Sequence, residues 1–206
     1  MRLVCLGLRF GTGEELELPK LTHLESVEYG WWYAARISSN QALITLYSDV
    51  DTVRQGEIHD AKNWIKLLAA TEQTSRWASG LKPVDDQLLA FAAPSFCRDK
   101  IVGERWLAVG DCASTYDPIT SHGIQKSIAN GITASRVLAD YFEGRNFAFE
   151  YESMIKQQYQ AYLKMREEYY QLEQRWPESS FWKLMHSSLS SRHSEFHDSS
   201  PVSDIA

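Results

Sequence analysis

The stretch WLAVGDCASTYDPITSHGIQKSIANG, residues 106–131, runs from an apolar segment through two acidic turns into a helical pattern. The apolar run before Gly110 has the length and content of a short buried strand. Gly110 allows the backbone to approach a ligand closely, and Asp111 at the end of that strand offers an acceptor for hydroxyl groups. The turn therefore suits a polyol such as a sugar or a ribityl chain.

A helix mouth follows this turn. Pro118 fixes the chain direction and has no amide hydrogen, while the unpaired amides around His122, Gly123 and Ile124 point beyond the helix start. Such an end favours negative charge by about 0.3–1 kcal/mol when exposed and about 2 kcal/mol when partly buried. The sign suits a planar ring that becomes anionic on reduction. On spacing alone, however, an ordinary capped turn that binds nothing is the preferred interpretation.

The pattern outside this stretch predicts an antiparallel sheet followed by helices. Strands are expected over residues 2–10, 25–37, 41–49, 87–96 and 105–111. Residues 38–40 suit a hairpin turn. Asp60 is expected to cap a helix that runs to about Trp77 and turns four side chains inward, namely Trp64, Leu67, Leu68 and Thr71.

Two longer helices are predicted in the second half. The first covers residues 122–142, ends at Gly144 and carries small and apolar residues on one side, namely Ile124, Ile128, Gly131, Ser135, Leu138 and Phe142. The second keeps a 3.6-residue period until Pro177, with Tyr151, Ile155, Tyr159, Tyr162, Met165, Tyr169, Leu172 and Trp176 on one side. We interpret this aromatic stripe as core packing.

Composition narrows the function classes. The 206 residues carry a formal net charge of −6, which argues against a nucleic-acid partner. Cys5, Cys97 and Cys112 lack metal-ligand spacing, so we expect reduced thiols, no metal site and a cytoplasmic protein. No apolar run is long enough to cross a bilayer, and we predict no membrane partner.

The motif AVGDCASTYDPITSHGI resembles the second flavin-contacting motif of FAD-dependent aromatic monooxygenases and flavin-dependent halogenases. VEYGWWYAARI and ALITLYSD are similar to the substrate-domain sheet of the halogenase-like branch. EQRWPESSFW is similar to a C-terminal segment of flavoproteins that mature quinone-cofactor (tryptophylquinone) amine oxidases. The resemblance covers most of the chain to about Trp182.

The resemblance implies an α/β fold class, represented in this chain by an α+β portion of an FAD/NAD(P)-binding fold. We expect a substrate-domain sheet and helix over residues 1–90, then the C-terminal part of the FAD-binding domain over 91–145. A C-terminal helical segment is expected over 146–186. Residues 187–206 are Ser-rich and are expected to form a disordered tail.

The resemblance also implies site roles, with FAD as cofactor. Asp111, after Gly110, would bind the ribityl chain, and Pro118 would lie beside the isoalloxazine. The amides near Gly123 and Ile124 would face flavin N1 and the C2 carbonyl. His122 stands where it could touch the ring or the substrate, although a satisfied or solvent-facing histidine is preferred. The sequence names no catalytic acid or base.

Two departures from the family matter. The GxGxxG turn that binds the FAD pyrophosphate is missing, because GLRFGTGEEL has another glycine order followed by two acids. We therefore expect the C-terminal part of a longer enzyme, with its N-terminal βαβ unit lost or supplied by another chain and with exposed apolar patches on the sheet and on helix 124–142. Halogenases carry an acid where this chain has Thr120, which argues against halogenation. Of Trp31 and Trp32, at most one can line a substrate pocket, because strand neighbours face opposite ways.

The leading hypothesis is the C-terminal portion of an FAD-dependent monooxygenase that hydroxylates an aromatic, Trp-like group. Its substrate would be an aromatic small molecule or a partner polypeptide, and a reductase or NAD(P)H would supply electrons. A truncated, non-catalytic module that cannot hold FAD is the alternative from another class. A flavin-dependent halogenase is the further alternative.

Overall fold

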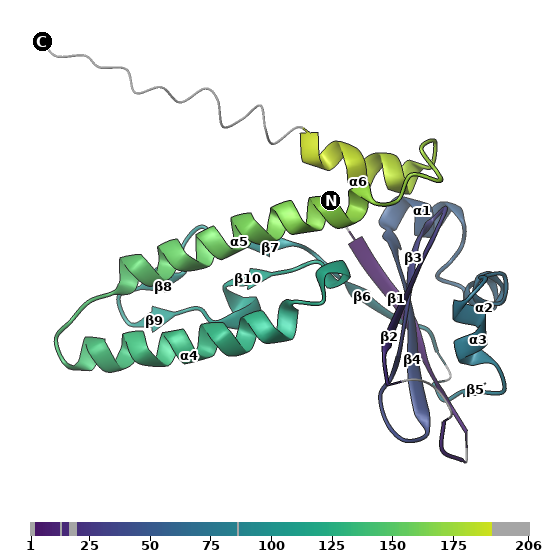
Figure 1. Ribbon diagram of the computed structural model, residues 1–206, viewed down its shortest axis with the longest axis horizontal. Coiled ribbons are helices and arrows are strands. Elements are labelled where there is room, and N and C mark those ends of the chain that lie inside the picture. The colour runs from purple at the N-terminus through teal and green to yellow at the C-terminus, as the bar shows by residue number, and fades with distance from the viewer. Residues whose placement is uncertain (1–2, 13, 17–19, 86, 191–206) are drawn as a thin grey trace, which may run out of the picture. The chain divides into compact units, whose positions relative to one another are not determined.

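The computed structural model describes residues 3–12, 14–16, 20–85 and 87–190, with side chains to residue 187. The chain forms two compact units (Figure 1). The first combines Met1–Ala92 with Glu173–Ala206, and the second is Ala93–Leu172. Helices and antiparallel strands occur in both units, which confirms the mixed α+β class expected for this chain.

The first unit is built on a six-stranded sheet in which every paired strand is antiparallel. Its strands are β1 (Leu3–Gly11), β2 (Thr22–Val27), β3 (Gly30–Arg36), β4 (Gln41–Asp49), β5 (Lys82–Pro83) and β6 (Leu89–Ala92). Their order is β2-β3-β4-β1-β5, and β6 also pairs with β1. The predicted strands near residues 2–10 and 41–49 and the hairpin at 38–40 are confirmed.

The predicted strand 25–37 is wrong in one respect, because the chain reverses inside it. β2 and β3 are separate strands joined at Glu28 and Tyr29. Gly30 follows with a φ of +150°, and a Cβ there would lie 2.1 Å from the Tyr47 carbonyl oxygen. Only glycine allows the two backbones to approach so closely.

Four helices accompany this sheet in the described residues: α1 (Val50–Gln55), α2 (Ala61–Ala69), α3 (Thr74–Ala78) and α6 (Ser180–Ser190). The Asp60 cap is confirmed, since its carboxylate accepts the amides of Lys62 and Asn63 at 2.9 and 3.1 Å. The helix predicted to reach Trp77 is instead split. The carboxylate of Glu25 on β2 accepts the amides of residues 72–74 and so starts α3 as a new helix.

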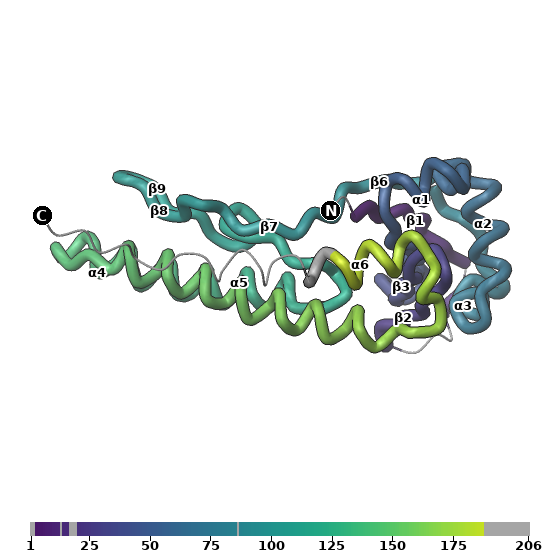
Figure 2. Tube along the Cα trace, turned by 90° about the horizontal axis from the view of Figure 1, so that it is seen from above, coloured from purple at the N-terminus to yellow at the C-terminus, as the bar shows by residue number. Residues whose placement is uncertain are grey.

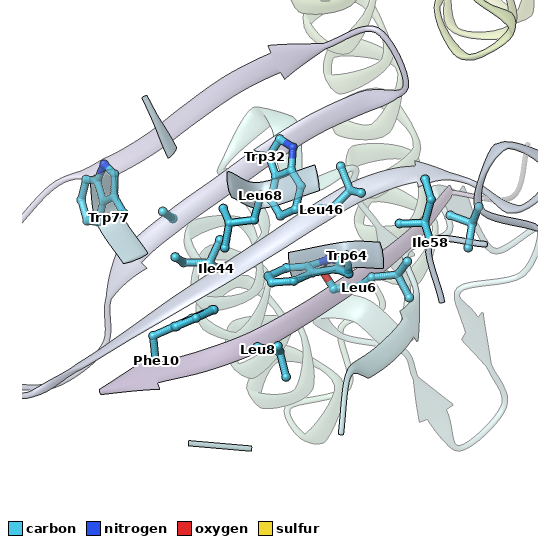
Figure 3. Close-up of a cluster of buried hydrophobic side chains, with 12 residues drawn as sticks. Leu6, Leu8, Phe10, Trp32, Ile44, Leu46, Ile58, Trp64, Leu68 and Trp77 are labelled. Carbon is cyan, nitrogen blue, oxygen red and sulfur yellow. The ribbon is translucent and has the colours of Figure 1, made fainter. Parts of the chain in front are cut away.

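The core of the first unit lies between the sheet and the α2–α3 pair (Figure 3). Trp32 on β3 and Trp64 on α2 are fully buried and meet edge to face, with ring centroids 4.9 Å apart. The indole of Trp64 also donates to the Leu6 carbonyl at 3.2 Å. Trp64 therefore joins helix to sheet through both apolar contact and a buried hydrogen bond.

Replacing Trp64 by Ala should lower the free energy of unfolding by about 3–5 kcal/mol, because it opens a cavity and leaves the Leu6 carbonyl without its partner. The urea midpoint followed by circular dichroism measures this loss. The neighbouring Ile65, whose side chain is 40% exposed, is the matched control, and Ile65→Ala should shift the midpoint much less. Equal shifts for both variants would contradict the assignment of Trp64 to the core.

The segment after residue 172 returns to the β2–β3 turn. Ser179 donates to the Glu28 carbonyl at 2.6 Å, and the buried Trp182 indole donates to the Val27 carbonyl at 2.9 Å. Glu173 accepts from Ser26 and Arg175. The EQRWPESSFW segment thus fastens α6 to the sheet.

Glu173 makes this attachment dependent on pH. Hydrogen bonds from Arg175 and Ser26 lower the pKa of Glu173 to about 2, against the opposing effect of burial. A carboxyl group whose pKa is lower in the folded state stabilises the protein above its ordinary pKa, and that contribution is lost as the pH falls.

Between about pH 4.5 and about pH 2, the urea midpoint of the natural chain should therefore fall more steeply than that of Glu173→Gln. Glu28→Gln, which changes an exposed carboxylate in the same unit, is the control and should keep the natural slope. Parallel curves for the natural chain and Glu173→Gln would refute the coupling.

The second unit places two long antiparallel helices beside short strands (Figure 2). The helices are α4 (Gly123–Phe142) and α5 (Ala148–Gln171). The strands are β7 (Phe96–Cys97), β8 (Val102–Gly103), β9 (Trp106–Leu107) and β10 (Ser114–Thr115), which form two separate antiparallel pairs. Buried side chains from the helices and from the segments next to the strands, including Ile101, Ala134, Tyr151 and Ile155, form its core.

Two predicted elements of this unit need correction. The strand expected over residues 105–111 is reduced to β9, which pairs only with β8 in the described residues and leaves Trp106 51% exposed. The second helix ends at Gln171 rather than at Pro177. Near its end the buried positions are Arg166 and Tyr170, because both side chains donate to the buried carboxylate of Asp117. Leu172, which was predicted to lie on the same side as the core residues, is 79% exposed.

The predicted segmentation also differs from the two units. The segment 146–186 is divided, because α5 packs on the core of residues 93–145 while the part after residue 172 joins the sheet. Residues 187–190 of the predicted tail belong to α6, and residues 191–206 lie outside the described residues.

None of the helices in the described part of the chain combines the length and apolar character needed to cross a bilayer.

Candidate functional site

The Gly-Asp turn presents a carboxylate at the surface of the second unit. Gly110 begins a short 3-10 turn, Gly110–Cys112, with a φ of +60°. A Cβ at this position would lie 3.1 Å from Ser127 Oγ on α4, so glycine serves both the backbone angle and the close approach. The side chain of Asp111 is 73% exposed and therefore accessible to a ligand.

The Asp-Pro turn is anchored from inside. Asp117 is 1% exposed, and its carboxylate accepts from Arg166 Nε at 3.0 Å, from the Tyr170 hydroxyl at 2.9 Å and from the Ile119 amide at 3.1 Å. Its own amide donates to the Tyr162 hydroxyl at 2.7 Å. Asp117 is therefore an internal anchor that ties the turn to α5, and it is not available to a ligand.

The buried site around Asp117 and Arg166 raises the pKa values of two of its side chains. Burial alone would lower the pKa of Arg166, but the charge of Asp117 raises it, so the guanidinium remains charged. Burial raises the pKa of Tyr162 to about 12, so its hydroxyl stays neutral.

Arg166→Met should cost about 3–5 kcal/mol in unfolding free energy, because the carboxylate of Asp117 would be left buried without its counter-charge. Arg145→Met is the control, since Arg145 pairs with Asp140 at the surface, and it should leave the denaturation midpoint near the natural value. A similar midpoint for both variants would refute the anchor.

The mouth of α4 has no cap from a side chain. His122 is the N-cap residue, is half-buried, and its Nδ1 contacts the Thr120 carbonyl instead of capping the helix. Among the described residues, nothing accepts a hydrogen bond from the amides of Gly123 or Ile124. These two donors are therefore free for an acceptor outside the helix.

Pro118 and Thr120 belong to the short turn Pro118–Thr120 that precedes this mouth. Pro118 is half-buried at its start. Thr120 is 2% exposed and its hydroxyl donates to the Asp117 carbonyl at 3.0 Å. The hydroxyl at the position where halogenases carry an acid thus holds the turn together.

Lys126 is a residue of this site that the sequence reading missed. Its Nζ donates to Asp111 Oδ1 at 2.8 Å and to the Ser114 carbonyl at 2.5 Å, and it lies 4.9 Å from the ring centre of Tyr116. Its spacing to Asn130 and Ala134, the other buried residues of α4, could have indicated an inward face.

The side of α4 predicted to carry apolar residues is exposed. Its large apolar side chains are 43–83% exposed, namely Ile124, Ile128, Leu138 and Phe142, and Ile132 beside them is 51% exposed. The inward face instead carries Lys126 and Asn130, and within the described residues the buried amide of Asn130 has no hydrogen-bond partner. The large exposed apolar side chains distinguish α4 from an ordinary amphipathic helix, although the inward Ala134 packs in the apolar core.

The two tryptophans of β3 are both fully buried. Trp32 belongs to the core against α2, and Trp31 stacks on Tyr47 with ring centroids 4.0 Å apart. The packing alternative therefore holds for Trp32, and Trp31 presents no exposed ring.

Known proteins similar to this chain include FAD-dependent oxidoreductases and flavin-dependent halogenases. LodB of Marinomonas mediterranea, to which an FAD-dependent oxidoreductase activity is ascribed, is 31% identical over 171 residues, which are 82% of this chain and 46% of LodB. By sequence and by fold, this chain is similar to FAD-dependent oxidoreductases. No protein-family model matches it.

Solved structures share the fold. The flavin-dependent halogenase CmlS matches 96% of this chain and 38% of its own length, with a TM-score of 0.73 and 16% identity. The myxobacterial chondrochloren halogenase CndH matches 94% and 46%, with a TM-score of 0.75 and 16% identity. QhpG, a peptidyl tryptophan dihydroxylase essential for tryptophylquinone cofactor biogenesis, matches 89% and 43%, with a TM-score of 0.64 and 18% identity.

These relatives confirm the predicted resemblance to halogenase-like flavoproteins, and FAD is the cofactor named for LodB. The chain spans less than half the length of LodB, CmlS, CndH and QhpG. The flavin-binding roles of six residues stay predictions, namely those of Gly110, Asp111, Pro118, His122, Gly123 and Ile124.

Proposed function

We propose that this chain forms the part of an FAD-dependent oxidoreductase that holds the ribityl chain and the isoalloxazine ring. The observation that carries the proposal is the exposed carboxylate of Asp111, tied by Lys126 to a helix whose first amides lack partners. An acceptor for hydroxyl groups and donors for a ring that gains negative charge thus belong to one compact unit.

The residues fit such a group by their chemistry. Asp111 accepts hydrogen bonds from the polyol, and the absence of a side chain on Gly110 lets the polyol approach. The amides of Gly123 and Ile124 donate to the N1 and C2-carbonyl edge of the ring, where the helix dipole adds stabilisation. Pro118 borders the ring, and His122 stands beside it. When bound, FAD supplies the redox chemistry, and the protein supplies orientation.

The finer proposal is a monooxygenase that hydroxylates a Trp-like group in a partner polypeptide, with a reductase or NAD(P)H as electron source and a cytoplasmic location. The fold shared with QhpG, named as a peptidyl tryptophan dihydroxylase, supports it. An aromatic small molecule is the alternative substrate. The neutral, inward-facing Thr120 weighs against the halogenase alternative.

We further propose that the pyrophosphate of FAD is bound by a segment outside residues 1–206 that covers the exposed face of α4. Ile128 and Phe142 are 62% and 83% exposed. Exposing apolar side chains of this size to water is unfavourable in free energy, and covering them with another surface would remove that cost. Without that segment the chain would be the non-catalytic module of the alternative hypothesis. Titration of residues 1–206 with FAD separates these cases, because tight stoichiometric binding excludes the module.

Asp111→Ala tests the proposal, made in the polypeptide expressed with any coding sequence that naturally precedes Met1. Flavin absorbance per protein and the FAD dissociation constant are measured. We expect a yellow natural protein and an affinity about tenfold or more weaker in the variant, as for loss of a charge-assisted hydrogen bond. The control Asp99→Ala, also at an exposed position, should bind normally. A colourless natural protein, or undiminished binding by Asp111→Ala, would overturn the proposal.

A further inference from the structure

The ion pair between Lys126 and Asp111 is unusually one-sided. The side chain of Lys126 is 5% exposed, whereas that of Asp111 is 73% exposed. Ordinary surface pairs expose both partners, and fully internal pairs bury both. A lysine is almost never buried without a partner, so the contact explains why Lys126 is tolerated inside. The reverse does not follow, since an exposed aspartate gains little from a buried cation.

Two hydrogen bonds and an aromatic ring surround the ammonium group of Lys126. Two hydrogen bonds go to Asp111 Oδ1 and to the Ser114 carbonyl, and the Tyr116 ring lies 4.9 Å away. An ammonium has three donors and no acceptor, so this set holds it in one orientation. In turn it holds Oδ1, while Oδ2 of Asp111 has no hydrogen-bond partner in the portion of the chain that is described.

Lys126 lies in the first turn of α4, so its ion pair with Asp111 is close in sequence to the free amides of the helix start. Lys126 is three residues after Gly123 and two after Ile124, whose amides are the free donors of the helix mouth. The same helix supplies Ser127, which packs under Gly110. One turn of helix therefore determines where the Asp111 carboxylate stands relative to those donors.

We propose that Lys126 is a positioning residue, which aims the free oxygen of Asp111 at the polyol of the flavin and keeps it in register with the amides of Gly123 and Ile124. The inference rests on the proposed function. It assigns Lys126 no contact with the cofactor, because its ammonium is buried and already donates to two oxygens of the protein.

Three variants and two flavins test the proposal. Lys126→Met removes the cation, Lys126→Arg keeps it, and Lys164→Met removes an exposed lysine of the same unit as control. Their affinities for riboflavin and for lumiflavin, which has the ring without the polyol, are measured in the polypeptide used for Asp111→Ala, after circular dichroism shows that each variant is folded.

Lys126→Met should weaken riboflavin about tenfold, as expected for a lost charge-assisted hydrogen bond, and leave lumiflavin unchanged. Lys126→Arg should restore part of that loss, and Lys164→Met should bind as the natural protein does. Lys126→Met combined with Asp111→Ala should bind no more weakly than Asp111→Ala alone, because both changes remove one arrangement. Equal weakening of both flavins, or additive losses, would show a merely structural role and overturn the inference.

The result distinguishes this inference from the proposed function. If the natural protein binds riboflavin and Asp111→Ala weakens it while Lys126→Met does not, the proposed function stands and the positioning role is wrong. If the natural protein binds neither these two flavins nor FAD, the proposed function fails and the positioning role fails with it. If it binds FAD alone, the same variants are compared by their affinity for FAD. Amine labelling read by mass spectrometry then reports whether the ion pair itself exists: Lys126 should react more slowly than Lys164, and Asp111→Ala should remove that difference.

Discussion

The second unit depends on a carboxylate kept away from water. Asp117 would be costly to bury alone, but Arg166, Tyr170 and the Ile119 amide satisfy it, and Tyr162 takes up its backbone amide. Three of these partners belong to α5, far along the chain. The network attaches the turn before α4 to α5. Because α4 begins directly after this turn, the attachment also fixes the position of its first residues.

The two acids of the motif consequently have opposite roles, although their surroundings in sequence look alike. Asp117 is buried and its carboxylate accepts hydrogen bonds from the protein. Asp111 is exposed, and within the described part of the chain only one of its carboxylate oxygens accepts a hydrogen bond, from Lys126. The buried pair of Asp117 and Arg166 fixes the position of the turn before α4. The pair of Asp111 and Lys126 presents an exposed carboxylate that a ligand can contact. This division is the physical basis for assigning a polyol to Asp111 alone.

The exposed apolar side chains of α4 connect the fold to the proposed whole protein. Lys126 and Asn130 are buried on its inward face, whereas large apolar side chains such as Ile128 and Phe142 are exposed. The edge strand β6 shows a similar feature, since all four of its residues are exposed and Phe91 is 61% exposed. Both surfaces agree with a protein in which further polypeptide covers them, as the lengths of LodB and CmlS allow.

Local patterns by themselves determined much of the fold. The alternation of apolar and polar residues predicted β1 and β4, and residues 38–40 predicted the hairpin before β4. Asp60 predicted the start of α2, and the 3.6-residue period predicted the start of α4 to within one residue. These elements depend on neighbours a few residues apart, which a linear sequence displays directly. The flavin was predicted from the resemblance of the motif around Asp111 to flavoproteins and not from its spacing, and the relatives agree.

Only the tertiary structure decided the rest. Glu25 starts α3 from a strand 47 residues earlier, Arg166 reaches back 49 residues to Asp117, and Lys126 reaches back 15 to Asp111. A period shows that a helix has two faces, but which face turns inward depends on what packs against it. The inward positions of α4 include Lys126, which donates to the Ser114 carbonyl and to Asp111, as well as Ala134, which packs in the apolar core. Charge pairing across long stretches of chain is a property of the folded arrangement, so no local pattern contained it.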